Sequence, residues 1–132
     1  MAKYFVDENL LPVGRALSHV REDVVHPGHV DLPEIHEGTK DPVWIPLVGR
    51  DALNLVVLTR DGKIRRKSAE AALCKQHRVR LVVLTGKKSL TKWENLGLLV
   101  RHWDKLDKTV TKLGNGYWAQ SLTSAGLTDL RL

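Results

Sequence analysis

The stretch Leu55-Val56-Val57-Leu58-Thr59-Arg60-Asp61-Gly62 decides the fold, because an unbroken apolar run ends on an acid and a glycine turn. Its leucine and valine content is typical of a strand buried on both faces of a parallel sheet. Lys3-Tyr4-Phe5-Val6 has the same character and runs into Asp7-Glu8-Asn9. If the two runs are neighbouring parallel strands, Asp7 and Asp61 lie side by side at the carboxyl edge of the sheet, where open α/β folds keep their ligand sites. We therefore expect the functional site at that edge.

Further apolar runs alternate with helical patterns along the rest of the chain. The expected strands are 3–7, 23–26, 55–59 and 80–84, and the expected helices are 11–20, one that begins at Asp41-Pro42, 64–77 and 90–113. This order predicts one α/β domain over residues 1–132, with three layers and a central, mostly parallel sheet of about four strands. The tail, 117–132, is expected to return as an extended segment or a short helix.

The expected helices have recognisable ends and apolar stripes. Asn9 is a candidate cap for the first helix, whose stripe contains Leu11, Leu17 and Val20. Asp41 is expected to cap the second helix, after an irregular, surface-exposed loop from 27 to 40. The long helix has a stripe that is expected to pack in the core: Trp93, Leu96, Leu99, Val100, Trp103, Leu106, Val110 and Leu113.

The composition fits a single soluble domain. At 132 residues, with 42% hydrophobic residues, the chain is long enough to bury one core and is not of the disordered class. The lone Cys74 excludes an internal disulfide and suits a reducing compartment. No apolar run approaches the ~20 residues of a membrane-spanning helix, and the first residues lack the apolar core of a secretory leader. We expect a cytoplasmic protein without a membrane segment.

The net charge of +6 is unevenly distributed along the sequence. Residues 1–59 hold five Lys and Arg against nine Asp and Glu, whereas residues 60–112 hold fifteen against five. A basic field beside an acidic cluster suits a polyanion held over bound metal ions. Solvated helix faces are the alternative explanation, but the segregation of the charges favours polyanion binding.

Asp7, Asp41 and Asp61 are the candidate catalytic residues. Two of them follow strands and one starts a helix, so folding can bring the three carboxylates into one cleft. Clustered carboxylates raise one another's pKa, and bound Mg²⁺ or Mn²⁺ would neutralise them. Such an ion also activates water and stabilises charge on a phosphoryl oxygen. Each acid alone also suits a turn or a helix cap, so the hypothesis of a metal-dependent reaction on phosphate rests on the set.

Three segments together resemble the compact PIN-like nuclease family. They are Phe5-Val6-Asp7-Glu8-Asn9-Leu10-Leu11-Pro12, Gly38-Thr39-Lys40-Asp41 at a helix start, and Val57-Leu58-Thr59-Arg60-Asp61 at a strand end. The resemblance covers residues 3 to about 85 and includes the toxins of VapBC-type toxin–antitoxin pairs. It implies a ribonuclease whose Mg²⁺ or Mn²⁺ is held by Asp7, Asp41 and Asp61. It also implies an RNA substrate, such as transfer or ribosomal RNA, and a cognate antitoxin protein that covers the acidic cleft.

The resemblance also assigns secondary roles. Glu8 and Asn9 match the start of the family's motif, and Thr59 matches a small hydroxyl residue that lines the site. A fourth carboxylate stays open between Glu8 and a loop acid, Glu34 or Glu37, because a basic stretch follows Asp61. The candidate phosphate-binding residues are Lys63, Arg65, Arg66, Lys67, Lys87 and Lys88.

A zinc site is one competing hypothesis. His26, His29 and His36 lie within one short segment, with Asp31 and Glu34 as further possible ligands. Their spacing matches no structural zinc pattern, and cysteine ligands are missing, which disfavours a zinc site.

Two further alternatives belong to other functional classes. Asp61, with Thr85 and Lys87 after a later strand, has the outline of a phosphoacceptor receiver domain. A non-catalytic RNA-binding module would use Trp93 and Trp103 to stack bases, although core packing is the expected role of both. Any exposed apolar part of the long helix would also suit a homodimer.

Overall fold

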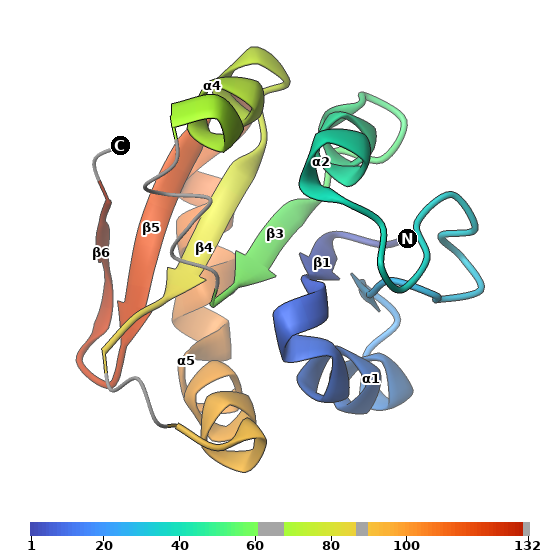
Figure 1. Ribbon diagram of the computed structural model, residues 1–132. Coiled ribbons are helices and arrows are strands. Elements are labelled where there is room, and N and C mark those ends of the chain that lie inside the picture. Colours follow the sequence, from blue (N-terminus) through green and yellow to red (C-terminus); the bar gives the residue numbers. More distant parts are fainter. Residues whose placement is uncertain (61–67, 87–89, 131–132) are drawn as a thin grey trace.

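The computed structural model describes residues 1–60, 68–86 and 90–130, which form one mixed sheet with helices on both faces (Figure 1). The strands are β1 (Tyr4–Val6), β2 (Val24–Val25), β3 (Val56–Thr59), β4 (Arg80–Leu84), β5 (Trp118–Thr123) and β6 (Gly126–Asp129). They lie in the order β2-β1-β3-β4-β5-β6, and all neighbours are parallel except β5 and β6. The α/β class is confirmed. The expectation of about four strands is wrong, because the tail adds β5 and β6.

Four described α-helices cover the two faces of the sheet. They are α1 (Leu11–Val20), α2 (Asp41–Gly49), α4 (Ser68–Gln76) and α5 (Lys92–Leu113), and a short 3-10 turn, η1 (Glu8–Leu10), precedes α1. Because successive strand residues point to opposite faces, Tyr4 and Val6 pack with α1 and α5, whereas Phe5 and Val57 pack with α2 and α4. The two cores confirm a three-layer domain. None of the described helices is both long enough and apolar enough to cross a membrane.

The chain path places a switch point between β1 and β3. From β1 the chain first passes to the edge strand β2 and then returns to β3 on the other side of β1. Val6 pairs with Leu58, and the backbone N–H of Asp7 donates to the carbonyl of Leu58 at 3.0 Å. In open α/β sheets the point where the strand order reverses is where ligands bind. The first two residues beyond this pairing, Asp7 and Thr59, therefore lie at the expected edge.

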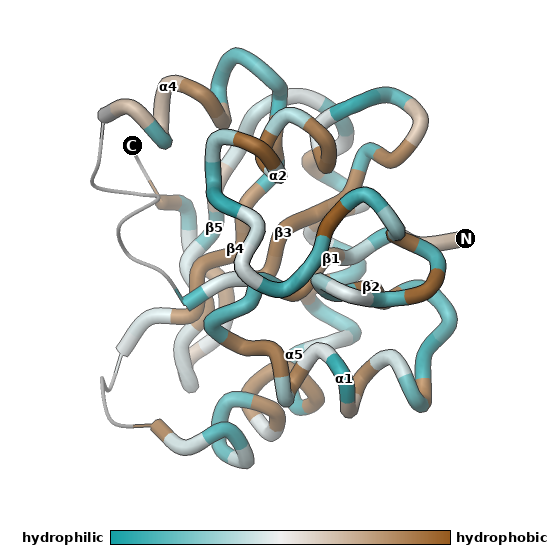
Figure 2. Tube along the Cα trace, turned by 45° about the vertical axis from the view of Figure 1, so that its right-hand side comes forward, coloured by the Kyte–Doolittle hydropathy of each residue, from teal (hydrophilic) through white to brown (hydrophobic). Residues whose placement is uncertain are grey.

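Several local expectations are wrong in detail. Asn9 does not cap α1, whose N-cap position is held by Leu10 without a side-chain hydrogen bond. Asp41 is the first residue of α2 and Lys40 occupies the N-cap position. The segment 27–40 is irregular but only partly exposed, because Leu32 and Ile35 are fully buried against α2 and the sheet. Figure 2 shows the same pattern, with hydrophobic residues concentrated in the central strands and also present in parts of the loops.

The long helix α5 confirms the expectation for 90–113, except that Trp93, Val100 and Leu113 of the expected core stripe are exposed. Thr91 and Glu94 form a capping box at its start, and Trp103 is buried with its ring edge against Tyr4. Trp93 and Val100, by contrast, are 80% and 60% exposed. At about 100° per residue these two lie well to the side of the buried face centred on Leu99, so their side chains point to solvent rather than into the core. Val20, at the end of α1, is also exposed rather than buried.

Two glycines in helices give a matched stability prediction. A Cβ placed on Gly49 would overlap the backbone carbonyl oxygen of His77, so α2 approaches the end of α4 closely at this point. A Cβ on Gly97, in α5, would meet no atom within 4 Å. We expect Gly49→Ala to lower the free energy of unfolding by about 1–3 kcal/mol. Gly97→Ala should raise it by up to about 1 kcal/mol, because alanine favours the helix. Urea unfolding of both variants checks this, and equal effects would contradict it.

Candidate active site at the carboxyl edge of the sheet

Asp7 lies at the carboxyl end of β1 and is only 6% exposed. Its Oδ1 atom accepts a hydrogen bond from the backbone N–H of Glu8 at 2.6 Å. Its Oδ2 atom accepts from the Thr59 hydroxyl at 2.9 Å and from the Asn9 amide at 3.2 Å. Donors on both oxygens stabilise an ionised carboxylate in a buried place. Asp7 is therefore held in one orientation.

Asn9 and Thr59 tie the ends of β1 and β3 together. The Asn9 amide also donates to the Thr59 hydroxyl at 3.2 Å, and its Oδ1 atom accepts from the backbone N–H of Arg60 at 3.1 Å. The Asn9 carbonyl accepts from the Lys92 ammonium at 3.0 Å, which connects α5 to the same segment. The sequence predicted that Asn9 and Thr59 line the site, and the structure places both against Asp7.

Asp41 faces the same edge from the start of α2. Its Oδ1 atom accepts from the indole N–H of Trp44 at 2.9 Å, one turn further along the helix. A hollow of about 250 Å³ is lined by Asp7, Glu8, Asn9, Thr39, Asp41 and Trp44. The structure thus brings Asp7 and Asp41 to one hollow, although they belong to different segments.

Glu70 is a site residue that the sequence analysis missed. It lies in the first turn of α4 and lines a second hollow, of about 340 Å³, together with Glu8, Thr39 and Asp41. Its Oε2 atom is buried and has no hydrogen-bond partner among the described residues. In the sequence Glu70 is distinguished only as the one acid between Asp61 and Glu94, which does not by itself place it at the site. Glu70 is therefore a further candidate for the fourth carboxylate, beside Glu8.

The pKa of the Cys74 thiol is affected by the negative charges of this region. Cys74 is fully buried in α4, and burial raises its pKa to about 12, with further contributions from the charges of Asp41 and Glu70. Each neighbouring anion disfavours the thiolate. Two carboxylates from different helices therefore act on the same buried group.

The other acids considered for the fourth position have different partners. The Glu8 carboxylate accepts from the backbone N–H of Gly38 and lines both hollows, so it holds the segment before α2 in place. Glu34 pairs with Arg50 at 3.3 Å, and Glu37 pairs with Arg15 at 2.9 Å. The structure does not bring Glu34 or Glu37 into the hollows.

The remaining predicted residues lie outside the described part of the chain. They are Asp61, Lys63, Arg65, Arg66, Lys67, Lys87 and Lys88. Over residues 1–60, 68–86 and 90–130, no three His, Cys, Asp or Glu side chains are gathered as a metal site. The zinc hypothesis gains no support, because the buried His26 binds the Pro27 carbonyl through Nδ1 and contacts His29 by its ring edge. Burial also lowers the pKa of His26.

The carboxylate, amide and hydroxyl oxygens at this edge form a donor set of hard oxygen ligands, which suits Mg²⁺ or Mn²⁺ better than a soft metal. Neither the curated proteins nor the solved structures include one with significant similarity to the chain. A family model described as PIN like domain matches residues 2–86. This range contains β1 to β4 and the segments that carry Asp7, Asp41 and Glu70. The chain therefore belongs to the PIN-like domain family.

Proposed function

We propose that the protein is a metal-dependent ribonuclease that hydrolyses phosphodiester bonds of RNA. PIN domains are generally nucleases, and they typically use divalent metal ions. The observation that carries the proposal is the buried, fully hydrogen-bonded Asp7 at the β1–β3 switch point, with Asp41 and Glu70 lining adjoining hollows. The basic sequence from residue 60 to residue 112 supports a polyanionic substrate.

The residues at the site fit a hard divalent cation. Asp7, Asp41 and Asp61 would hold it, with Glu70 as a further ligand. The buried Oε2 atom of Glu70, which has no hydrogen-bond partner among the described residues, is the kind of atom that a cation would satisfy. A bound Mg²⁺ or Mn²⁺ supplies an activated water and neutralises charge on the phosphoryl oxygens.

The chain's own residues prepare the site before a substrate arrives. The Thr59 hydroxyl and the Asn9 amide fix the Asp7 carboxylate, so its oxygens need no reorientation during the reaction. The Trp44 indole does the same for Asp41. The Lys92 ammonium binds the Asn9 carbonyl and brings a positive charge beside this segment, where a phosphate of the substrate would be attracted.

Within this proposal the protein acts as the toxin of a VapBC-type pair in the cytoplasm. Its partner is a cognate antitoxin that covers the acidic hollows or inserts a basic side chain between Asp7 and Asp41. The resemblance of the Asp-Glu-Asn-Leu and Leu-Thr-Arg-Asp segments supports this assignment. Growth arrest on expression of the chain, relieved by the product of a neighbouring small gene, is the expected result.

The direct test is cleavage of RNA by the purified protein. We expect transfer or ribosomal RNA to be cut in the presence of Mg²⁺ or Mn²⁺ and to stay intact in EDTA. The ends of the fragments identify the bond that is broken. A panel of RNAs left intact with both metals would refute the enzyme and leave a non-catalytic module.

A further inference from the structure

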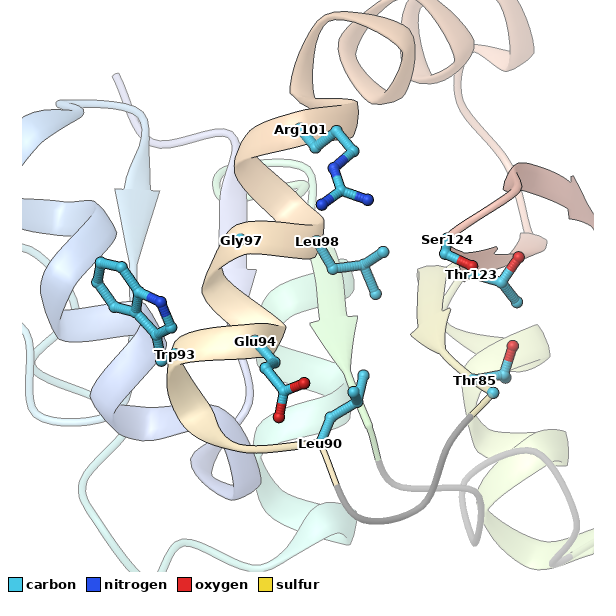
Figure 3. A pocket seen from close by; sticks show the side chains of 10 residues that line it. Thr85, Leu90, Trp93, Glu94, Gly97, Leu98, Arg101, Thr123 and Ser124 are labelled. Atoms are coloured by element: carbon cyan, nitrogen blue, oxygen red, sulfur yellow. The ribbon is translucent and has the colours of Figure 1, made fainter.

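Trp93 is the largest exposed side chain near the candidate active site. It is 80% exposed in the first turn of α5, outside the segment matched by the family model. Trp93 is one of the residues that line a pocket of about 430 Å³, together with Leu98 and Arg101 of the same helix (Figure 3). Trp93 also lines a smaller hollow of about 170 Å³, shared with Pro12 and Leu96. It is an aromatic surface open to solvent.

A hydrogen bond connects the start of α5 to the segment that carries Asp7. Lys92, the residue before Trp93, donates from its ammonium to the carbonyl of Asn9 at 3.0 Å. Asn9 in turn binds Asp7 and lines the hollow of the candidate active site. A strand of RNA whose phosphate lies at Asp7 therefore passes close to the first turn of α5.

A row of cations continues from there along α5. Arg101, Lys105, Lys108 and Lys112 are spaced by four, three and four residues, which places them on one side of the helix. All four are exposed, and none forms an ion pair with another described residue. The row extends over about three turns, or about 16 Å. We call these four residues the cationic row.

The composition of this surface favours a nucleic acid over a protein partner. Among the described residues of α5, only Trp93, Val100 and Leu113 are large, apolar and exposed, and charged residues separate them. A protein-docking face carries a contiguous apolar patch, whereas single-stranded nucleic acid is bound by aromatic platforms beside positive charge. A Cβ added to Gly97, one turn beyond Trp93, would meet no atom within 4 Å, so this part of the surface is open.

We propose that the outer surface of α5 binds an unpaired segment of the RNA, with one base stacked on Trp93 and the following phosphates along the cationic row. The inference rests on the proposed ribonuclease function and extends it to the choice of substrate. It selects single-stranded RNA, because a paired base has no free face to stack on Trp93. The specificity would therefore reside in a helix that the family model does not include.

The test measures binding without cleavage. A fluorescently labelled, unpaired RNA of twelve nucleotides is titrated with the full chain in EDTA, and anisotropy gives the dissociation constant. We expect Trp93→Leu to weaken binding about tenfold, because stacking contributes about 1–3 kcal/mol per base. Trp93→Phe keeps an aromatic face and should stay within about threefold of the wild type. Val20→Ala, which changes an exposed apolar residue elsewhere, should have no effect.

The cationic row is tested by salt dependence. Lys105→Ala with Lys108→Ala should reduce the slope of log affinity against log salt by about 1.4, or about 0.7 for each lost phosphate contact. Lys75→Ala, which removes an exposed cation of α4, should leave the slope unchanged.

The outcomes separate this inference from the proposed function. Three results would each overturn it. Trp93→Leu could bind unpaired RNA as tightly as the wild type does, or it could lose affinity for fully paired RNA to the same degree as for unpaired RNA. The third is that the wild type binds no RNA. Weak binding by Trp93→Ala with full binding by Trp93→Leu would identify an apolar docking surface and overturn it too. Absence of metal-dependent cleavage with the expected binding pattern would refute only the ribonuclease.

Discussion

Replacing Asp7 with alanine is expected to reduce RNA cleavage by about a thousandfold or more while the protein remains folded. The change removes a carboxylate that is buried at the switch point and held by Thr59 and Asn9. It also removes the acceptor for the Glu8 backbone N–H, so the free energy of unfolding should fall by about 1–3 kcal/mol. Initial rates with a labelled RNA give the loss of activity, and circular dichroism shows whether the fold is kept.

A second variant and a control separate chemistry from folding. Asp7→Asn keeps the size of the side chain and one acceptor oxygen, and it should lose activity to a similar degree. Glu37→Gln neutralises an exposed acid that pairs with Arg15 away from the hollows, and it should cleave as the wild type does. Activity retained by both Asp7 variants would show that the site lies elsewhere on the molecule.

Glu70→Gln is expected to lower activity by about 10- to 100-fold and to raise the concentration of Mg²⁺ or Mn²⁺ needed for half-maximal cleavage. The substitution preserves volume in α4 and removes the charge of a side chain whose Oε2 atom is buried without a described hydrogen-bond partner. For the same reason the stability of the metal-free protein should be unchanged or slightly higher. Metal titrations of cleavage, with urea unfolding in EDTA, measure both effects.

Glu34→Gln is the control for Glu70→Gln. Glu34 pairs with Arg50 on the surface, so Glu34→Gln should change neither activity nor the requirement for metal. An unchanged metal requirement in Glu70→Gln would remove Glu70 from the site. The fourth position would then remain with Glu8.

The central strands could be predicted because their local composition indicates that they are buried. The runs at 55–59 and 80–84 are apolar on both faces, and both became strands of the parallel sheet. The tail was harder, because β5 contains Gln120 and Ser121, polar residues that are buried through partners unknown from sequence. In the sequence such polar residues resemble those of a loop, because their hydrogen-bond partners are not evident.

The candidate site was predictable only in part, for a related reason. Asp7, Asn9 and Thr59 could be assigned because the two strand ends meet at one edge and match a family motif. Glu70 was missed because its position depends on how α4 packs against α2, which no local pattern specifies. Trp93 was assigned to the core because its spacing is helical, but spacing alone does not define the width of the buried face.

The hydrogen bond between Asp7 and Thr59 joins residues 52 positions apart in the sequence. A growing chain that ends before β3 has no Thr59 to orient Asp7, and one that ends before α4 has no Glu70. Contacts of this kind form late, because the intervening chain must first lose its conformational freedom. Catalytic competence is then acquired in the same step as the tertiary fold. If the protein is the ribonuclease proposed above, its nascent chain would be inactive on the ribosome until the chain through α4 has been made and folded.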